Sequence, residues 1–295
     1  MSNTRRGVLA MIVASVIWAL STFYYKGLSE VPPLEMLSHR LVWTVVFFAL
    51  VLAAQGRAGE IGQLLARPRE WRVLTVSAVT IAVNWLVFIH AVQAGHALEA
   101  SLGYYVFPLF AIALGYLFLG EHYSRVQAVA IGLAAVAVLV LGIGLGTPPW
   151  AALILASSFA AYGLVKGQVR VGPVASVFIE TLLLAPFALV FLWGASGGLW
   201  PDLDGRYGGI FGRDFGTSLL LVLAGPLTGV PLVLFSYAAR RIPYSTVGLI
   251  QYLNPTIQFA IAVFAFGEPF TLWHAIAFPL IWAGLALYSW DTWRR

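Results

Sequence analysis

The most regular feature of the chain is a series of apolar runs of about twenty residues, separated by short stretches that carry Pro, Gly and charged residues. A helix of roughly 20 apolar residues can cross the hydrocarbon core of a bilayer. Strands of an outer-membrane barrel would alternate apolar and polar positions over about ten residues, which these runs do not do. The predicted spans are, to within about four residues, Gly7–Tyr25, Leu34–Ala54, Trp71–Gln93, Leu98–Leu119, Ser124–Gly144, Pro149–Val165, Pro173–Gly194, Thr217–Ala239, Ser245–Phe266 and Phe270–Trp290.

The composition explains what surrounds these helices. Of the 295 residues, 60% are hydrophobic and 10% are charged, whereas about 25% of residues are charged in soluble domains. A surface with so few charges meets lipid rather than water. Ten spans use about 200 residues, which leaves no room for a folded domain outside the membrane. The chain has no cysteine, which excludes disulfides, thiolate metal sites and a cysteine nucleophile.

The basic residues predict the orientation of the helices. When the loops are assigned alternately to two sides, one side holds 13 of the 17 Lys and Arg residues. The other side holds Lys26, Arg206 and Arg213, and Arg40 falls inside the second span. Because cytoplasmic loops retain Lys and Arg, we expect both termini in the cytoplasm and the protein in the cytoplasmic (inner) membrane. The 13 residues are Arg5, Arg6, Arg57, Arg67, Arg69, Arg72, Arg125, Lys166, Arg170, Arg240, Arg241, Arg294 and Arg295.

The two halves of the chain repeat each other with a shift of 147 residues. The shift brings Leu102–Pro108 onto Leu249–Pro255, Gly120-Glu121 onto Gly267-Glu268, and Phe88 and Ala91 onto Phe235 and Ala238. The first Tyr-x-x-Pro motif lies on a helix predicted to run toward the cytoplasm, and the second on a helix predicted to run away from it. We therefore predict an all-α fold of two inverted five-helix repeats, residues 1–146 and 147–295.

Inverted repeats are typical of transporters that work by alternating access around a site near the midplane. Pro108 and Pro255 are predicted near the middle of their helices, where each removes a backbone hydrogen bond and allows bending. A kink that serves only packing is the alternative. Gly120 and Gly267 are expected to stop their helices, and Glu121 and Glu268 to begin the next ones, where a carboxylate favours the positive end of the helix dipole.

Polar and aromatic residues inside the predicted spans indicate a substrate site, because polar groups inside spans usually face the protein interior. Amide, hydroxyl and aromatic groups would suit a zwitterionic or weakly polar organic solute. Ordinary helix packing is the alternative for any single Tyr or Trp. The candidates are Asn84, Trp85, Tyr104, Tyr105, Gln251, Tyr252 and Asn254, with Trp18, Tyr162 and Tyr237 as further aromatic residues.

Three ionisable residues inside the spans are candidates for coupling or for an ion pair. Arg40 lies one to two turns inside its helix and either snorkels to the surface or pairs with Glu180. Glu180 is equally a candidate proton site. His90, which we expect near the cytoplasmic end of its helix, titrates near neutral pH, although a packing histidine is the alternative.

Enzyme motifs are missing from the sequence. It has no His-Glu-x-x-His, no paired intramembrane aspartates, no Gly-x-Ser-x-Gly and no phosphate-binding loop. We therefore expect no catalytic residues, no metal and no cofactor.

Several motifs resemble a known family. They are Val83-Asn84-Trp85, Ala100–Tyr104, Gly225–Leu232 and Gln251–Thr256. With ten helices in two inverted halves, they resemble the drug/metabolite transporter superfamily, its EamA-type members and especially the RarD-like branch. In that branch an Asn is expected before the first proline, as Asn254 stands before Pro255, whereas this chain has Phe107 there.

The resemblance extends to YddG-type exporters of aromatic and other amino acids, and it implies an exporter of small organic metabolites, most concretely amino acids. Efflux of drug-like amphiphiles is the alternative, followed by an intramembrane enzyme on lipid-linked substrates and a passive channel. The expected partners are a small-molecule substrate and the lipid bilayer, without nucleic acid and in a monomeric assembly.

Overall fold

The structure, a computed structural model, contains helices joined by loops, with no β-strand in the ranges that it describes. These ranges are residues 3–57, 59, 68–120, 124–146, 148–166, 173–239, 241–242, 247 and 250–294.

In the described ranges, the first half of the chain contains five helices. They are α1 (Asn3–Gly27), α2 (Pro33–Ala54), α4 (Pro68–Gln93), α5 (Ala97–Leu119) and α6 (Arg125–Leu145). The second half contains α7 (Trp150–Lys166), α8 (Pro173–Ser196), α9 (Phe215–Ala239), α11 (Leu253–Ala260) with the π-helix η1 (Ile261–Ala265), and α12 (Leu272–Arg294). These bounds follow the predicted apolar runs closely, and the first residues of the ninth run lie partly outside the described ranges.

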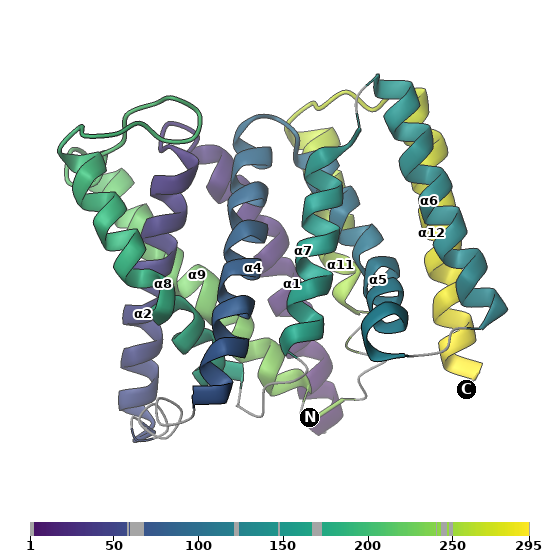
Figure 1. The fold of residues 1–295 in the computed structure, drawn as a ribbon, viewed down its shortest axis with the longest axis horizontal. Coiled ribbons are helices and arrows are strands. Elements are labelled where there is room, and N and C mark those ends of the chain that lie inside the picture. The colour runs from purple at the N-terminus through teal and green to yellow at the C-terminus, as the bar shows by residue number, and fades with distance from the viewer. Residues whose placement is uncertain are drawn as a thin grey trace.

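The helices run between two ends of the bundle (Figure 1). Both termini lie at one end, which we call the terminal face, and the long connection over residues 197–214 lies at the other, the loop face. Local sequence sets several helix ends: Ser124 and Gln127 form a capping box at the start of α6. Gly120 ends α5 at φ +67°, a left-handed conformation that glycine adopts without strain.

The outer surface of the bundle is suited to lipid. Eight helices are long and apolar enough to cross a membrane, and two shorter apolar segments, Trp150–Val165 and Leu253–Ala265, complete the set in the described part of the chain. Large apolar side chains that are 63–82% exposed lie along these helices, among them Leu50, Leu139, Ile143, Phe187 and Phe264. Soluble proteins rarely expose so much apolar surface, so these side chains contact the acyl chains of a bilayer. The protein is a multi-pass membrane protein.

The contacts between helices follow the inverted repeat. Helix α2 packs on its counterpart α8, α5 on α11, and α6 on α12, whose ribbons run side by side in Figure 1. Helices α1 and α9 pack on each other, as do their respective counterparts α7 and α4. The fold is therefore two intertwined five-helix repeats of opposite direction rather than two separate bundles.

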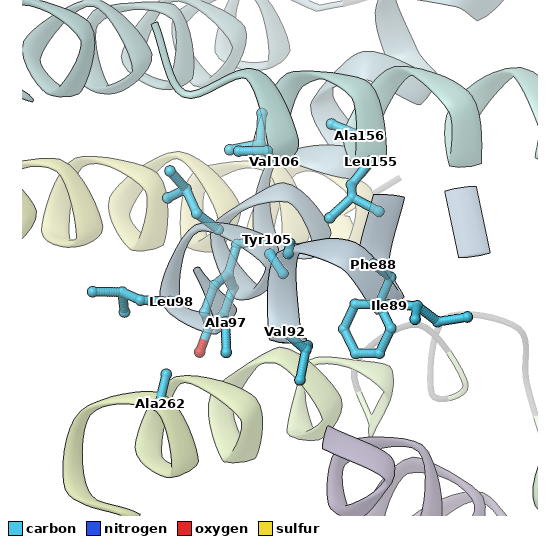
Figure 2. Close-up of a cluster of buried hydrophobic side chains, with 14 of the residues drawn as sticks. Phe88, Ile89, Val92, Ala97, Leu98, Tyr105, Val106, Leu155, Ala156 and Ala262 are labelled. Carbon is cyan, nitrogen blue, oxygen red and sulfur yellow. The ribbon is translucent and has the colours of Figure 1, made fainter. Parts of the chain in front are cut away.

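A central apolar cluster joins the halves (Figure 2). It includes Phe88 of α4, Val106 of α5, Leu155 of α7 and Ala262 of η1. Figure 2 shows the Tyr105 side chain directed from α5 toward the helix that carries Ala262. The core thus lies where the first and second halves meet.

The surroundings of the two prolines differ in detail. Pro108 lies inside α5, but Pro255 is the third residue of α11, because Tyr252 forms a turn directly before that helix. In a first turn, the N–H that proline lacks would have no intrahelical partner anyway. Residues 250 and 251 are helical as well, so the ninth span is interrupted at Tyr252, on the N-terminal side of Pro255, where a proline disturbs the helix.

Two expectations need correction. His90 lies in the last turn of α4 and is exposed, near Gln93, whose carbonyl accepts a hydrogen bond from Lys26. This is the loop face, whereas we expected His90 near the end that carries both termini. Glu268 does not begin the next helix, which starts at Leu272, and its carboxylate binds another helix instead, as described below. Glu121 lies outside the described residues.

Candidate functional site

Asn84, at the middle of α4, ties three helices together. Its Nδ2 donates to the carbonyl of Leu155 and to Oγ of Ser158, both at 3.0 Å. Its Oδ1 accepts from the hydroxyl of Tyr104 at 3.1 Å. The structure thus brings the predicted residues Asn84 and Tyr104 together across α4 and α5, and Asn84 is buried with its amide hydrogen-bonded on both sides.

Arg40 of α2 is buried among aromatic rings. Its exposed fraction is 7%, so it does not snorkel to the surface. The guanidinium lies over the ring of Trp85 at 3.9 Å and over that of Tyr25 at 5.7 Å, measured from Cζ to the ring centroid. Nη1 donates to the Tyr25 hydroxyl at 2.8 Å, whereas Nε has no hydrogen-bond partner among the described residues.

Glu180 of α8 is buried in a different set of contacts. Its carboxylate accepts from Oγ of Ser77 at 2.6 Å and from the hydroxyl of Tyr162 at 3.4 Å. The Tyr162 ring stacks on Phe159. The pairing of Arg40 with Glu180 is not what the structure contains: each side chain has its own hydroxyl partners.

A cavity of about 360 Å³ lies where α5, α11 and α12 meet. The hydroxyls of Tyr105 and Thr256 are 2.7 Å apart at its wall, and the predicted residue Tyr252 also lines it. Residues from both halves therefore line the same space, which is open to one side. The lining residues are Tyr105, Tyr252, Thr256, Trp282, Leu285, Ala286 and Ser289.

Two amide side chains on α11 hold acceptors without partners. Asn254 Oδ1 and Gln258 Oε1 are buried and have no hydrogen-bond partner among the described residues. They are four residues apart, so they lie on one face of the helix. Neither residue lines the cavity: each stands two positions after a cavity residue, Tyr252 or Thr256, and therefore lies on about the opposite side of α11.

Sequence reasoning missed Thr256, Gln258 and Trp282. Gln258 carried a usable signal, since it follows Asn254 by one helical turn inside an apolar run. Thr256 stood at the end of the motif that starts at Gln251. Trp282 carried no such signal, because its role depends on α12 bringing its ring against Tyr105 of α5 and Phe259 of α11.

Other predicted residues lie apart from these groups. Trp18 packs on Phe235 with ring centroids 6.1 Å apart. Tyr237 lies under the Arg241 guanidinium at 3.5 Å, near the terminal-face end of α9. Gln251 is half-buried just before α11. These three residues are not part of the cavity wall.

Carboxylates tie the loop face together by binding helix N-termini. Glu268 accepts from the backbone N–H groups of Ala97 and Leu98, at 2.8 and 2.7 Å, where α5 begins. Asp202 accepts from those of Leu34 and Glu35, where α2 begins, at 2.9 and 3.1 Å. A carboxylate at such a position satisfies backbone donors that lack intrahelical partners.

Burial affects the charge of both loop-face carboxylates. It raises the pKa of Glu268, although the hydrogen bonds from Leu98 and Ala97 act in the opposite direction. Burial also raises the pKa of Asp202, against the hydrogen bonds that it accepts. Both groups therefore hold a proton at a higher pH than an exposed carboxyl does.

Comparison with known proteins matches this architecture. The profile of the EamA-like transporter family matches residues 5–143 and again residues 148–290. Protein RarD of Streptomyces exfoliatus is 41% identical, covering 99% of this chain and 91% of the relative. Protein RarD of Escherichia coli is 38% identical, covering 98% and 96%. The uncharacterized transporter PA0485 of Pseudomonas aeruginosa is 39% identical, covering 99% and 96%.

A solved crystal structure supports the fold. It superposes with a TM-score of 0.61 and covers 98% of each chain at 18% sequence identity. At that identity the likeness concerns the fold alone. The two family matches and the RarD relatives cover nearly the whole chain. The chain belongs to the EamA-like transporter family of the drug/metabolite transporter superfamily, and it is similar to RarD over its full length.

Proposed function

We propose that the protein exports amino acids, including aromatic ones, by alternating access of its two halves. A membrane transporter of small molecules is what the family implies. The observation that carries the finer proposal is the cavity between α5, α11 and α12, because both halves build it from aromatic rings and hydroxyls. Its volume of about 360 Å³ falls in the range of small-molecule sites.

The cavity chemistry suits a solute with an apolar body and polar ends. Tyr105, Tyr252 and Trp282 offer ring faces and edges, which favour aromatic side chains. The hydroxyl oxygens of Tyr105 and Thr256, at the cavity wall, offer acceptors to an ammonium group. A zwitterionic amino acid with an aromatic side chain combines these features.

Alternating access requires the shared helices to bend. We propose Pro108, inside α5, and Pro255, beside the Tyr252 turn, as the points where bending occurs. The Tyr105–Thr256 hydrogen bond joins these two helices, so relative motion of α5 and α11 would break it and reshape the cavity. Asn84, Trp85 and Tyr104 would then contact the solute in another conformation.

The proposal also covers the membrane in which the protein lies, its orientation and its oligomeric state. We propose the cytoplasmic membrane with both termini in the cytoplasm, which the position of both termini at one face supports. The halves divide at residues 146 and 147, and a single chain holds the complete cavity, which supports a monomer. No catalytic step is proposed.

The test is transport by purified protein in vesicles. We expect protein-containing vesicles preloaded with unlabelled L-phenylalanine to accumulate the labelled amino acid, with saturation. A panel of labelled amino acids, with and without a pH gradient, then ranks the solutes. If no amino acid enters above the level of empty vesicles while amphiphilic drugs do, the exporter handles drug-like compounds and the amino-acid proposal is wrong.

Tyr252→Ala tests the cavity directly. Removing this ring should lower the initial rate about threefold to tenfold, since an aromatic pair contributes about 0.5–1.5 kcal/mol beyond area burial. The matched control is Tyr207→Ala, because Tyr207 is 63% exposed in the loop-face connection. Equal rates for both variants at equal protein levels would remove Tyr252 from the site.

A further inference from the structure

We propose that Arg40 is an anion-binding centre of the transport pathway, where the guanidinium binds the carboxylate of the transported solute. This inference rests on the proposed function, because it names the part of an amino acid that the protein would recognise at this position. Binding a solute carboxylate is a different role for Arg40 from those expected from the sequence, which were snorkelling to the surface, coupling transport to an ion, or pairing with Glu180.

The first support is the burial of an obligatory charge. Arg40 is 7% exposed and lies two turns into α2, where α1 and α4 cover it. A lysine or histidine in such a place could lose its proton, but an arginine side chain stays charged in proteins. Its charge must therefore be balanced by contacts.

The contacts present are neutral and incomplete. One nitrogen, Nη1, donates to the Tyr25 hydroxyl, while Nε donates to nothing among the described residues. No carboxylate of the described chain lies within 4 Å of the guanidinium, the distance that defines an ion pair. A guanidinium has five N–H donors, so most of its capacity is unused.

Two carboxylates are candidates to pair with Arg40: Glu35 is close to it in the sequence, and Glu180 was the expected partner. Both bind other groups. Glu35, more than one turn before Arg40, accepts from the backbone N–H groups of Gly209 and Ile210 and lies 3.8 Å from His39. Glu180 accepts from Ser77 and Tyr162. The buried Arg40 cation is therefore not paired with Glu35 or Glu180, because both carboxylates bind other groups.

The guanidinium stacks on Trp85, and its Nε, unlike Nη1, has no hydrogen-bond partner among the described residues. Trp85 covers a face of the guanidinium, at 3.9 Å from Cζ to the ring centroid. Such stacking partly replaces the lost hydration of the cation. The N–H groups point outward in the plane, where two parallel hydrogen bonds match the two oxygens of a carboxylate.

Further aromatic rings lie next to Tyr25, the residue that binds Arg40. Tyr25 meets Phe88 edge-on at 5.8 Å, and Phe88 lies 5.7 Å from Tyr104. A solute whose carboxylate binds Arg40 would have rings beside its remaining atoms. The class of ligand that fits is therefore a carboxylate with an apolar or aromatic body.

The test compares acids with their amides. We will follow binding of phenylacetate and phenylacetamide, and of L-phenylalanine and L-phenylalaninamide, to the purified full chain by calorimetry. We expect each acid to bind the wild type at least about tenfold more tightly than its amide, because two charge-assisted hydrogen bonds are lost in the amide. Equal affinities for acid and amide in the wild type would overturn the proposal without any variant.

The variants assign the preference to Arg40. Arg40→Gln should bind acid and amide alike, and Arg40→Lys should keep the charge but lose most of the preference, because an ammonium does not form the paired contact. Arg72→Gln, which changes an exposed arginine on α4, should behave as the wild type. An unchanged acid preference in a monodisperse Arg40→Gln protein, or in Arg40→Lys if the former does not fold, contradicts the proposal.

The outcomes separate this inference from the proposed function. If vesicles take up no amino acid but the wild type binds phenylacetate through Arg40, the amino-acid exporter is wrong and the anion site stands. If L-phenylalanine is transported equally well by the wild type and by Arg40→Gln, the exporter stands and Arg40 is not its anion site.

Discussion

At the scale of single residues, the buried polar groups fall into two kinds. Asn84 and Glu180 are hydrogen-bonded by side chains from neighbouring helices. Arg40 Nε, Asn254 Oδ1 and Gln258 Oε1 lack partners in the described ranges. A buried polar group without a partner costs free energy, so the first kind stabilises the helix arrangement and the second is suited to meet a solute or water.

Asn84 should be coupled energetically to Tyr104. Asn84→Ala leaves the Tyr104 hydroxyl without its acceptor, and Tyr104→Phe leaves Asn84 Oδ1 without its donor. Each change should lower the free energy of unfolding by about 1–3 kcal/mol. The double variant should fall short of the sum by about 1 kcal/mol, because both changes break the same hydrogen bond. Unfolding in mixed micelles measures all three variants.

The exposed residue Tyr207 provides the control for that cycle. Tyr207→Phe combined with Asn84→Ala should be additive, since Tyr207 is 63% exposed in the loop-face connection. Additivity of Asn84→Ala with Tyr104→Phe as well would show that their hydrogen bond contributes nothing measurable.

At the scale of helices, the two halves differ in how closely equivalent elements approach. Gly103 lets α5 pack against α7, because a Cβ there would lie 2.9 Å from the Ala152 carbonyl oxygen. The shift of 147 residues places Ile250 at the equivalent position of the second half. That side chain excludes an equally close approach, so the inverted repeat is related in topology but not identical in packing.

A matched pair of glycine substitutions tests this close approach. Gly103→Ala should destabilise the protein by about 1–3 kcal/mol, because the helices must move apart to accept the methyl group. Gly132→Ala on α6 has no atom within 4 Å of the new Cβ and should be neutral or stabilising by up to about 1 kcal/mol. Thermal unfolding of the two variants in detergent compares them, and equal effects would mean that α5 and α7 are free to separate.

At the scale of the whole molecule, the helices could be predicted from the sequence, but the contacts between them could not. The ten apolar runs and the inverted repeat could be predicted because lipid imposes a length and a composition on every span. The contacts of Asn84 with Leu155 and Ser158 could not, since they depend on how α4 packs against α7. The same holds for Glu268, whose expected role at its own helix is replaced by binding α5.

The Glu268 bridge between η1, α12 and α5 makes the stability of the loop face depend on pH. Because burial raises the pKa of Glu268 above 4.5, the folded protein holds this proton more tightly than the unfolded chain. Its contribution to stability is therefore fully present below about pH 4.5 and is lost as the pH rises through the raised pKa. Glu268→Gln carries no such proton and escapes this loss.

We therefore expect the Tm of Glu268→Gln, relative to wild type, to rise as the pH is increased from about 4 to about 8. Asp214→Asn supplies a control of opposite sign, because hydrogen bonds from Thr217 lower the pKa of Asp214. Its stabilisation is lost as the pH falls, so the relative Tm of Asp214→Asn should decrease as the pH rises from about 3 to about 5. Thermal unfolding in detergent across both pH ranges measures the two slopes. A falling slope for Glu268→Gln would mean that the hydrogen bonds from Ala97 and Leu98 outweigh burial, and that the carboxylate stabilises the loop face in its charged form.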